Sequence, residues 1–106
     1  MQCGGMDLQY FKDHILEEID GADEYIRLAI ELKAMDASWA KNLVEMSAAE
    51  LDHAAKLFKM FENYCDLISK PYDEVPEYIS NCRKKVIKMY TRRSAEVRYM
   101  HDMYSK

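Results

Sequence analysis

Glycine and proline are scarce in this chain. Only 3 of the 106 residues are glycine and 2 are proline. A sandwich or barrel of many strands needs a turn roughly every 8–12 residues, which this composition cannot supply. Few turn-formers together with 49% hydrophobic residues predict a small number of long helices, packed in a single domain over residues 1–106.

Long apolar runs and closely spaced cysteines are also lacking. No stretch approaches the roughly 18 apolar residues of a membrane span, and no basic region followed by an apolar stretch opens the chain, so we expect neither a secretory signal nor membrane association. Cys3, Cys65 and Cys82 form no C-x-x-C pair, which excludes a zinc ribbon. Their scattered, odd-numbered set predicts reduced thiols and a cytoplasmic location, with a Cys65–Cys82 disulfide as the alternative.

Charge is distributed unevenly along the chain. Residues 1–70 hold 14 acidic and 7 basic side chains, whereas residues 71–106 hold 5 and 8, so that a chain of net charge −4 ends in a basic segment. A net charge of +3 in that segment is small beside the many phosphate contacts that drive nucleic-acid binding. The pattern therefore favours a solvated helix face, or a face that meets the acidic half of another copy, over a nucleic-acid surface.

Apolar residues recur with helical spacing in the first two-thirds of the chain. The spacing predicts one helix over residues 7–35 and a second over residues 36–68, with Asp36 or Ser38 as the N-cap of the second. Because the link between them is short, we expect an antiparallel helical hairpin over residues 7–68.

A third helix follows a break at residues 69–76. Pro71 ends the second helix, and Asp73 is the expected cap of a basic C-terminal helix over residues 72–105. This segment has few bulky aliphatic residues and carries Arg93 on its apolar stripe, so we expect it to lie at the periphery.

Ionisable residues interrupt both apolar seams of the hairpin near their midpoints. The expected seams are Leu8, Phe11, Ile15, Glu18, Ala22, Tyr25, Ala29 and Leu32, and then Trp39, Leu43, Met46, Glu50, His53, Leu57, Met60, Tyr64 and Leu67. An uncompensated carboxylate in a helical core costs several kcal/mol. Glu50 and His53 share one helix face. Glu18 and Glu50 lie roughly 27 and 21 Å from the turn, and the turn and the reach of the carboxylates can absorb the difference of about 6 Å, so we expect them to lie level across the hairpin.

Three level ligands of this kind make half of a known site. A Glu from one helix and Glu-x-x-His from its neighbour are half of a di-metal carboxylate centre in a four-helix bundle. The chain has no second Glu-x-x-His, so a two-fold pair of chains would be needed to complete both the bundle and the centre. Oxygen ligands with imidazole suit iron or manganese, and zinc would also fit.

The combined pattern resembles one half of a rubrerythrin/ferritin-like domain over about residues 8–68. Glu18 is followed seven residues later by Tyr25, and Glu50-Leu-Asp-His53 follows after about thirty residues more. The resemblance implies iron binding by Glu18, Glu50 and His53, with two iron ions per dimer, Tyr25 beside the redox site, and oxidation of Fe(II) by dioxygen or peroxide. It also implies a homodimer or a ring of dimers, as in the half-length encapsulated ferritin-like proteins.

Two features depart from these relatives, and a different function remains open. The rubredoxin-like domain of rubrerythrin peroxidases has no counterpart here, and the terminal Tyr-Ser-Lys does not match an encapsulin-docking peptide. The alternative is a non-enzymatic helical oligomerisation or adaptor protein, in which the buried Glu and His residues fix the register of the helices. His14 and His101 lie off the seams and are expected at the surface.

Overall fold

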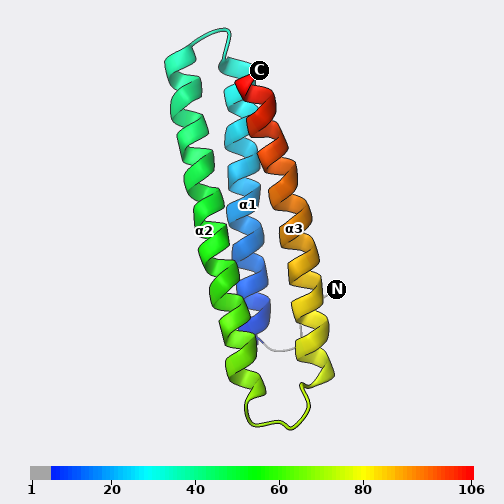
Figure 1. Ribbon diagram of the computed structural model, residues 1–106. Coiled ribbons are helices and arrows are strands. Elements are labelled where there is room, and N and C mark those ends of the chain that lie inside the picture. Colours follow the sequence, from blue (N-terminus) through cyan, green and yellow to red (C-terminus); the bar gives the residue numbers. More distant parts are fainter. Residues whose placement is uncertain (1–5) are drawn as a thin grey trace.

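The protein is a bundle of three long helices. The structure, a computed structural model, describes residues 6–106 and contains α1 (Met6–Leu32), α2 (Ala37–Ser69) and α3 (Glu77–Ser105). α1 lies between the other two helices, and α2 runs antiparallel to both (Figure 1). The bundle measures 58 × 18 × 17 Å. The predicted all-α fold is confirmed, whereas the predictions for Cys3 and for the start of the chain lie outside the described residues.

The turn between α1 and α2 is closed by an N-cap at Asp36. Its Oδ1 accepts hydrogen bonds from the backbone N–H groups of Ser38 at 3.0 Å and Trp39 at 3.1 Å, and from the Ser38 hydroxyl at 2.7 Å. The bond from the Ser38 hydroxyl, followed by that from the Trp39 backbone, lowers the pKa of Asp36. Of the two predicted caps, Asp36 is therefore the one used, and Ser38 supports it.

The start of α3 differs from the sequence-based expectation. Pro76, rather than Asp73, is the N-cap residue, and no side chain caps this helix. Asp73 is exposed in the connection between the helices. Proline suits this position because its fixed φ, here −55°, is compatible with chain entry into a helix and its missing N–H is not needed there.

The buried face of α2 lies one residue away from the predicted seam, whereas that of α1 matches the predicted seam at every second position, namely Leu8, Ile15, Ala22 and Ala29. Ile19 and Ile26 are fully buried on α1, whereas the predicted Glu18 and Tyr25 are only half-buried. The fully buried positions on α2 are Ala40, Ser47, Ala54, Phe61 and Cys65. Small residues in this row let the two helix backbones approach closely, and the larger side chains of the predicted row are left further out.

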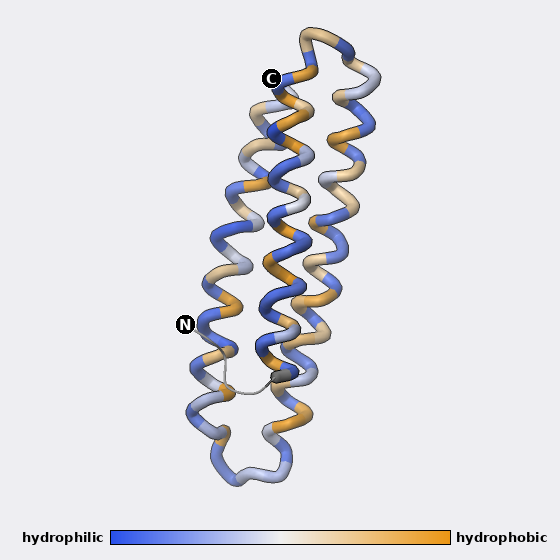
Figure 2. Tube along the Cα trace, turned by 180° about the vertical axis from the view of Figure 1, so that it is seen from behind, coloured by the Kyte–Doolittle hydropathy of each residue, from blue (hydrophilic) through white to orange (hydrophobic). Residues whose placement is uncertain are grey.

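α3 packs along the outside of the hairpin, mainly against α1, and buries a row of its own residues there. Ile79, Cys82, Val86 and Val97 are buried, and the Tyr90 ring stacks on the Phe58 ring of α2 with their centroids 4.3 Å apart. Hydrophobic and hydrophilic residues alternate along each helix (Figure 2). Among residues 6–106, no helix is long and apolar enough to cross a membrane.

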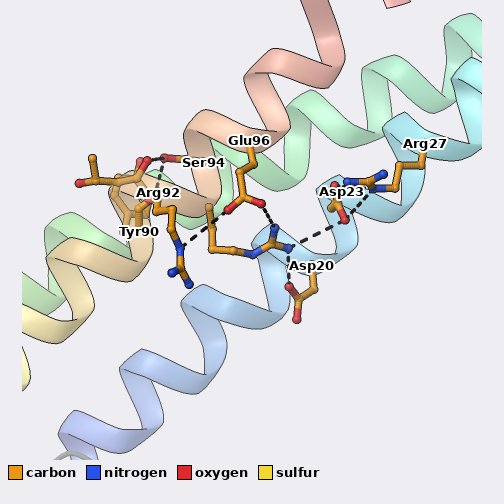
Figure 3. A network of polar contacts seen from close by, with 9 residues as sticks. Asp20, Asp23, Arg27, Tyr90, Arg92, Ser94 and Glu96 are labelled. Carbon is orange, nitrogen blue, oxygen red and sulfur yellow. Dashed lines mark hydrogen bonds and ion pairs between the residues drawn. The ribbon is translucent and has the colours of Figure 1, made fainter. Parts of the chain in front are cut away.

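Arginines of α3 pair with acidic residues of the same chain. Arg93 Nη2 lies 2.9 Å from Asp20 Oδ1 and 3.9 Å from Asp23 Oδ2, and its Nη1 lies 3.3 Å from Glu96 (Figure 3). Closer to the start of α3, Arg83 pairs with Asp66 at 2.7 Å. At these two positions the basic helix therefore meets its own acidic hairpin, and the stripe position of Arg93 is explained by ion pairing with α1.

The two described cysteines are in different states. Cys65 is a buried free thiol, and burial raises its pKa. Cys82 is disulfide-bonded. A Cys65–Cys82 bridge is therefore absent, and the prediction of reduced thiols is wrong for Cys82.

Candidate metal centre

Glu18, Glu50 and His53 meet on the outer face of the hairpin. α1 supplies Glu18, and one turn of α2 supplies both Glu50 and His53. His53 Nδ1 lies 3.6 Å from Glu18 Oε2 and 4.0 Å from Glu50 Oε1. One potential ligand atom from each residue lies within 4.8 Å of the others, so that a single cation could contact all three. The predicted alignment of these residues across the hairpin is confirmed.

The carboxylates of this cluster lack sufficient hydrogen-bond donors. Glu18 Oε2 is buried and has no hydrogen-bond partner when both carboxylates are ionised. The pKa of Glu50 is raised mainly by a hydrogen bond with the Glu18 carboxylate, which requires a proton between the two groups. Burial of Glu50 raises its pKa further. Two carboxylates in contact are stabilised either by a proton between them or by a cation. At neutral pH the donor set therefore fits a metal ion.

An open cavity of about 490 Å³ lies beside the cluster along α1. It is lined by Asp13, Leu16, Glu17, Glu18, Asp20, Gly21, Glu24 and Glu50. Six of these eight residues are acidic, and a concentration of one charge sign in a cleft raises the local concentration of counter-ions. The cavity gives cations a route to Glu18 and Glu50 from solvent.

Tyr25 is not part of the cluster of potential ligands. It lies seven residues after Glu18 on α1 and is half-buried. Among the residues that the structure describes, the group of potential ligands consists of Glu18, Glu50 and His53 alone. The expected role of Tyr25 next to the redox site stays a prediction.

An exposed row of large residues, here called the outer stripe, runs along α2 through His53. It consists of Trp39, Met46, His53, Met60 and Leu67, each seven residues from the next. The four apolar members are 45–57% exposed, and the His53 side chain is 53% exposed. These residues belong to the seam that was predicted to be buried in the hairpin, but within one chain they face solvent, so that prediction is wrong for this row. His53 stands at its centre, with two apolar residues on either side.

The structure adds a buried polar contact that sequence reasoning missed. The Ser47 hydroxyl donates to the backbone oxygen of Ala22 at 2.7 Å, and the Ser47 hydroxyl oxygen lies 2.9 Å from His101 Nε2. Because the Ser47 proton is used on Ala22, His101 must donate its Nε2–H. This contact joins all three helices. The prediction of a surface His101 is wrong, since that residue is half-buried, and no periodic pattern links positions 47 and 101.

Protonation of His101 is expected to destabilise the fold. Burial lowers the pKa of His101 below its ordinary value of 6.5, although Asp102 opposes the shift. The neutral ring therefore contributes stability that is present above pH 6.5 and is lost as the pH falls through the lower pKa of the folded state. We expect the melting temperature of the original protein to fall more, or rise less, than that of His101→Gln on acidification from about pH 7.5 to 5. His14→Gln is the matched control, and an equal response in both variants would contradict the assignment.

Comparison with known proteins gives no family assignment. No family model, no curated protein and no solved structure matches the chain. The function must therefore be argued from the chain itself.

Proposed function

We propose that this protein binds iron between two copies of its helical hairpin and oxidises Fe(II). The observation that carries the proposal is the cluster of Glu18, Glu50 and His53, with its buried carboxylate oxygen that no donor satisfies. A proton or a cation is needed there, and two carboxylates with an imidazole are typical ligands of iron and manganese, with zinc as a further fit.

The partner in this proposal is a second copy of the same chain. One cluster supplies three protein ligands, whereas a di-metal centre of the ferritin-like type needs four carboxylates and two histidines. A two-fold axis doubles the set, and the outer stripe supports such an axis because its apolar residues are arranged symmetrically about His53. In an antiparallel pair, Met46 of each copy would pack against Met60 of the other, and the two clusters would face each other.

The residues of this chain would have distinct roles in binding the metal ions. In each copy, Glu18 and His53 together would hold one ion, and the Glu50 carboxylates of the two copies would complete the ligand set. The acidic cavity would attract the incoming cation. A pair of iron ions supplies electrons to dioxygen or peroxide, and the surrounding apolar stripe would keep bulk water from the ions. The resemblance to the rubrerythrin/ferritin-like family agrees with this activity, and it also implies that such dimers could assemble into a ring.

Iron analysis tests the proposal directly. Protein loaded anaerobically with Fe(II) and freed of unbound metal should hold about one iron per chain and should oxidise Fe(II) faster than buffer. Glu50→Ala should lose most of this iron, and Glu45→Ala, an exposed carboxylate on the same helix, should keep it. Equal iron in Glu50→Ala and in the original protein would refute the metal site.

The same experiment separates the non-enzymatic alternative. An oligomerisation or adaptor protein would use the same exposed outer stripe, which is the observation that favours it. It would associate without iron, and its melting temperature would not change with chelators or with added Fe(II). A dimer that binds no added Fe(II) would therefore replace the ferroxidase proposal with this second function.

A further inference from the structure

Gly21 occupies a position in α1 where glycine is unfavourable for the helix. It lies near the middle of Met6–Leu32, far from both ends. Glycine in a helix interior loses more conformational freedom on folding than alanine does, and it lowers helix stability. Gly21 is the single glycine of the described residues, so its place in the middle of a helix calls for a local reason.

The space beside Gly21 is filled by the carboxylate of Glu50. A Cβ atom added at position 21 would lie 3.2 Å from Glu50 Oε2, 3.8 Å from Cδ and 3.9 Å from Cγ. These three closest atoms all belong to the Glu50 side chain, and none belongs to the backbone of a neighbouring helix. The missing side chain therefore makes room for a carboxylate and is not needed for close packing of α1 on α2.

The same carboxylate contacts the rest of the cluster. Its other oxygen, Oε1, lies 4.0 Å from His53 Nδ1, and the group contacts Glu18 as well. Gly21 also lines the acidic cavity next to these residues. Glu50 is thus enclosed between α1 on one side and its two fellow ligands on the other.

We propose that Gly21 is a positioning residue that holds the Glu50 carboxylate where it can share a cation with Glu18 and His53. This inference rests on the proposed function. A side chain at position 21 would push the Glu50 carboxylate away by a few tenths of an ångström. Ligand distances in metal sites are held within about 0.2 Å, so a displacement of that size is enough to weaken binding.

Gly21→Ala is expected to change helix stability and metal binding in opposite directions. The metal-free variant should melt a few degrees higher than the original protein, because alanine favours the helix. Its affinity for Fe(II), measured by anaerobic titration, should fall about 10-fold, since removal or misplacement of groups that orient metal ligands typically costs about 10–100-fold. A merely structural glycine would give the higher melting temperature with unchanged affinity.

Asn63→Ala is the matched control for helix stability. Asn63 is an exposed residue on α2, outside the group of potential ligands, and alanine also favours the helix there. This variant should melt higher and bind Fe(II) with the original affinity. If Gly21→Ala also binds Fe(II) as tightly as the original protein, the positioning role is overturned.

Crystal structures of the metal-free original protein and of Gly21→Ala give a second test that needs no iron. We expect the Glu50 carboxylate to leave its place against α1 in the variant, while the backbones of α1 and α2 superpose. A carboxylate that stays in place would overturn the inference. Failure of the original protein to bind Fe(II) would instead refute the proposed function, so the two failures are distinguishable.

Discussion

Replacement of Met60 by lysine is expected to convert the proposed dimer into monomers and to remove most of the iron that it would bind. Met60 is 54% exposed on the outer stripe, seven residues from His53. A lysine at this position is solvated in the single chain, but it would be buried without a partner charge between two copies. The desolvation of two such lysines should weaken association at least about 100-fold, or roughly 3 kcal/mol. Sedimentation equilibrium at about 10 μM protein measures the loss of association, and iron analysis of the same samples measures the loss of iron.

Met103→Lys is the matched control for this substitution. Met103 is similarly exposed but lies on α3, away from the outer stripe. This variant should remain dimeric and hold iron as before. A dimeric, iron-loaded Met60→Lys protein would show that the outer stripe is not the contact between copies.

Replacement of Glu18 by glutamine is expected to stabilise the metal-free protein while it abolishes iron binding. The side-chain amide introduced by Glu18→Gln can donate a hydrogen bond to Glu50, which the original carboxylate can do only when it is protonated. Buried oxygens without a partner cost about 1–3 kcal/mol, so we expect a gain of about 1 kcal/mol at neutral pH for this half-buried pair. The loss of a charged ligand should weaken Fe(II) binding at least about 100-fold.

The pH dependence of stability should change in the same variant. The pKa of Glu50 is raised from 4.5, chiefly by its contact with Glu18, so the folded protein binds the Glu50 proton more tightly than the unfolded chain does. This contribution to stability is fully present below pH 4.5 and is lost as the pH rises through the raised pKa. Glu18→Gln should remove that loss in thermal melts between about pH 4 and 7. Glu45→Gln, at an exposed position on α2, is the control, and equal pH profiles in both variants would contradict the contact.

The periodicity of the sequence was sufficient to predict the helices and the height of the candidate ligands along the hairpin. Residues that recur every three or four positions face one side of a helix whatever surrounds it, and the rise per residue fixes their height. For this reason Glu18 and Glu50 could be aligned across the hairpin by counting residues from the turn, and the three-residue step from Glu50 placed His53 beside them.

Periodicity was not sufficient to decide which of two neighbouring rows is buried. On α2, the row with Trp39 and Met60 is richer in large apolar residues than the row with Ala40, Ser47 and Ala54. Hydrophobic patterns favour the first row, whereas close helix packing selects the small residues of the second. The contact of His101 with Ser47 was missed for a related reason, because it depends on how α3 docks and not on spacing within one helix.

All three candidate ligands come from α1 and α2, which has a consequence for synthesis on the ribosome. Because α1 and α2 precede α3 in the chain, both helices of the hairpin leave the ribosome before α3 does, so there is an interval in which α3 has not yet docked. During that interval Phe58 lacks the Tyr90 ring that later covers it, but the outer stripe and the Glu18–Glu50–His53 cluster are already formed. Neighbouring nascent chains on one messenger can therefore meet through complete hairpins before α3 has docked.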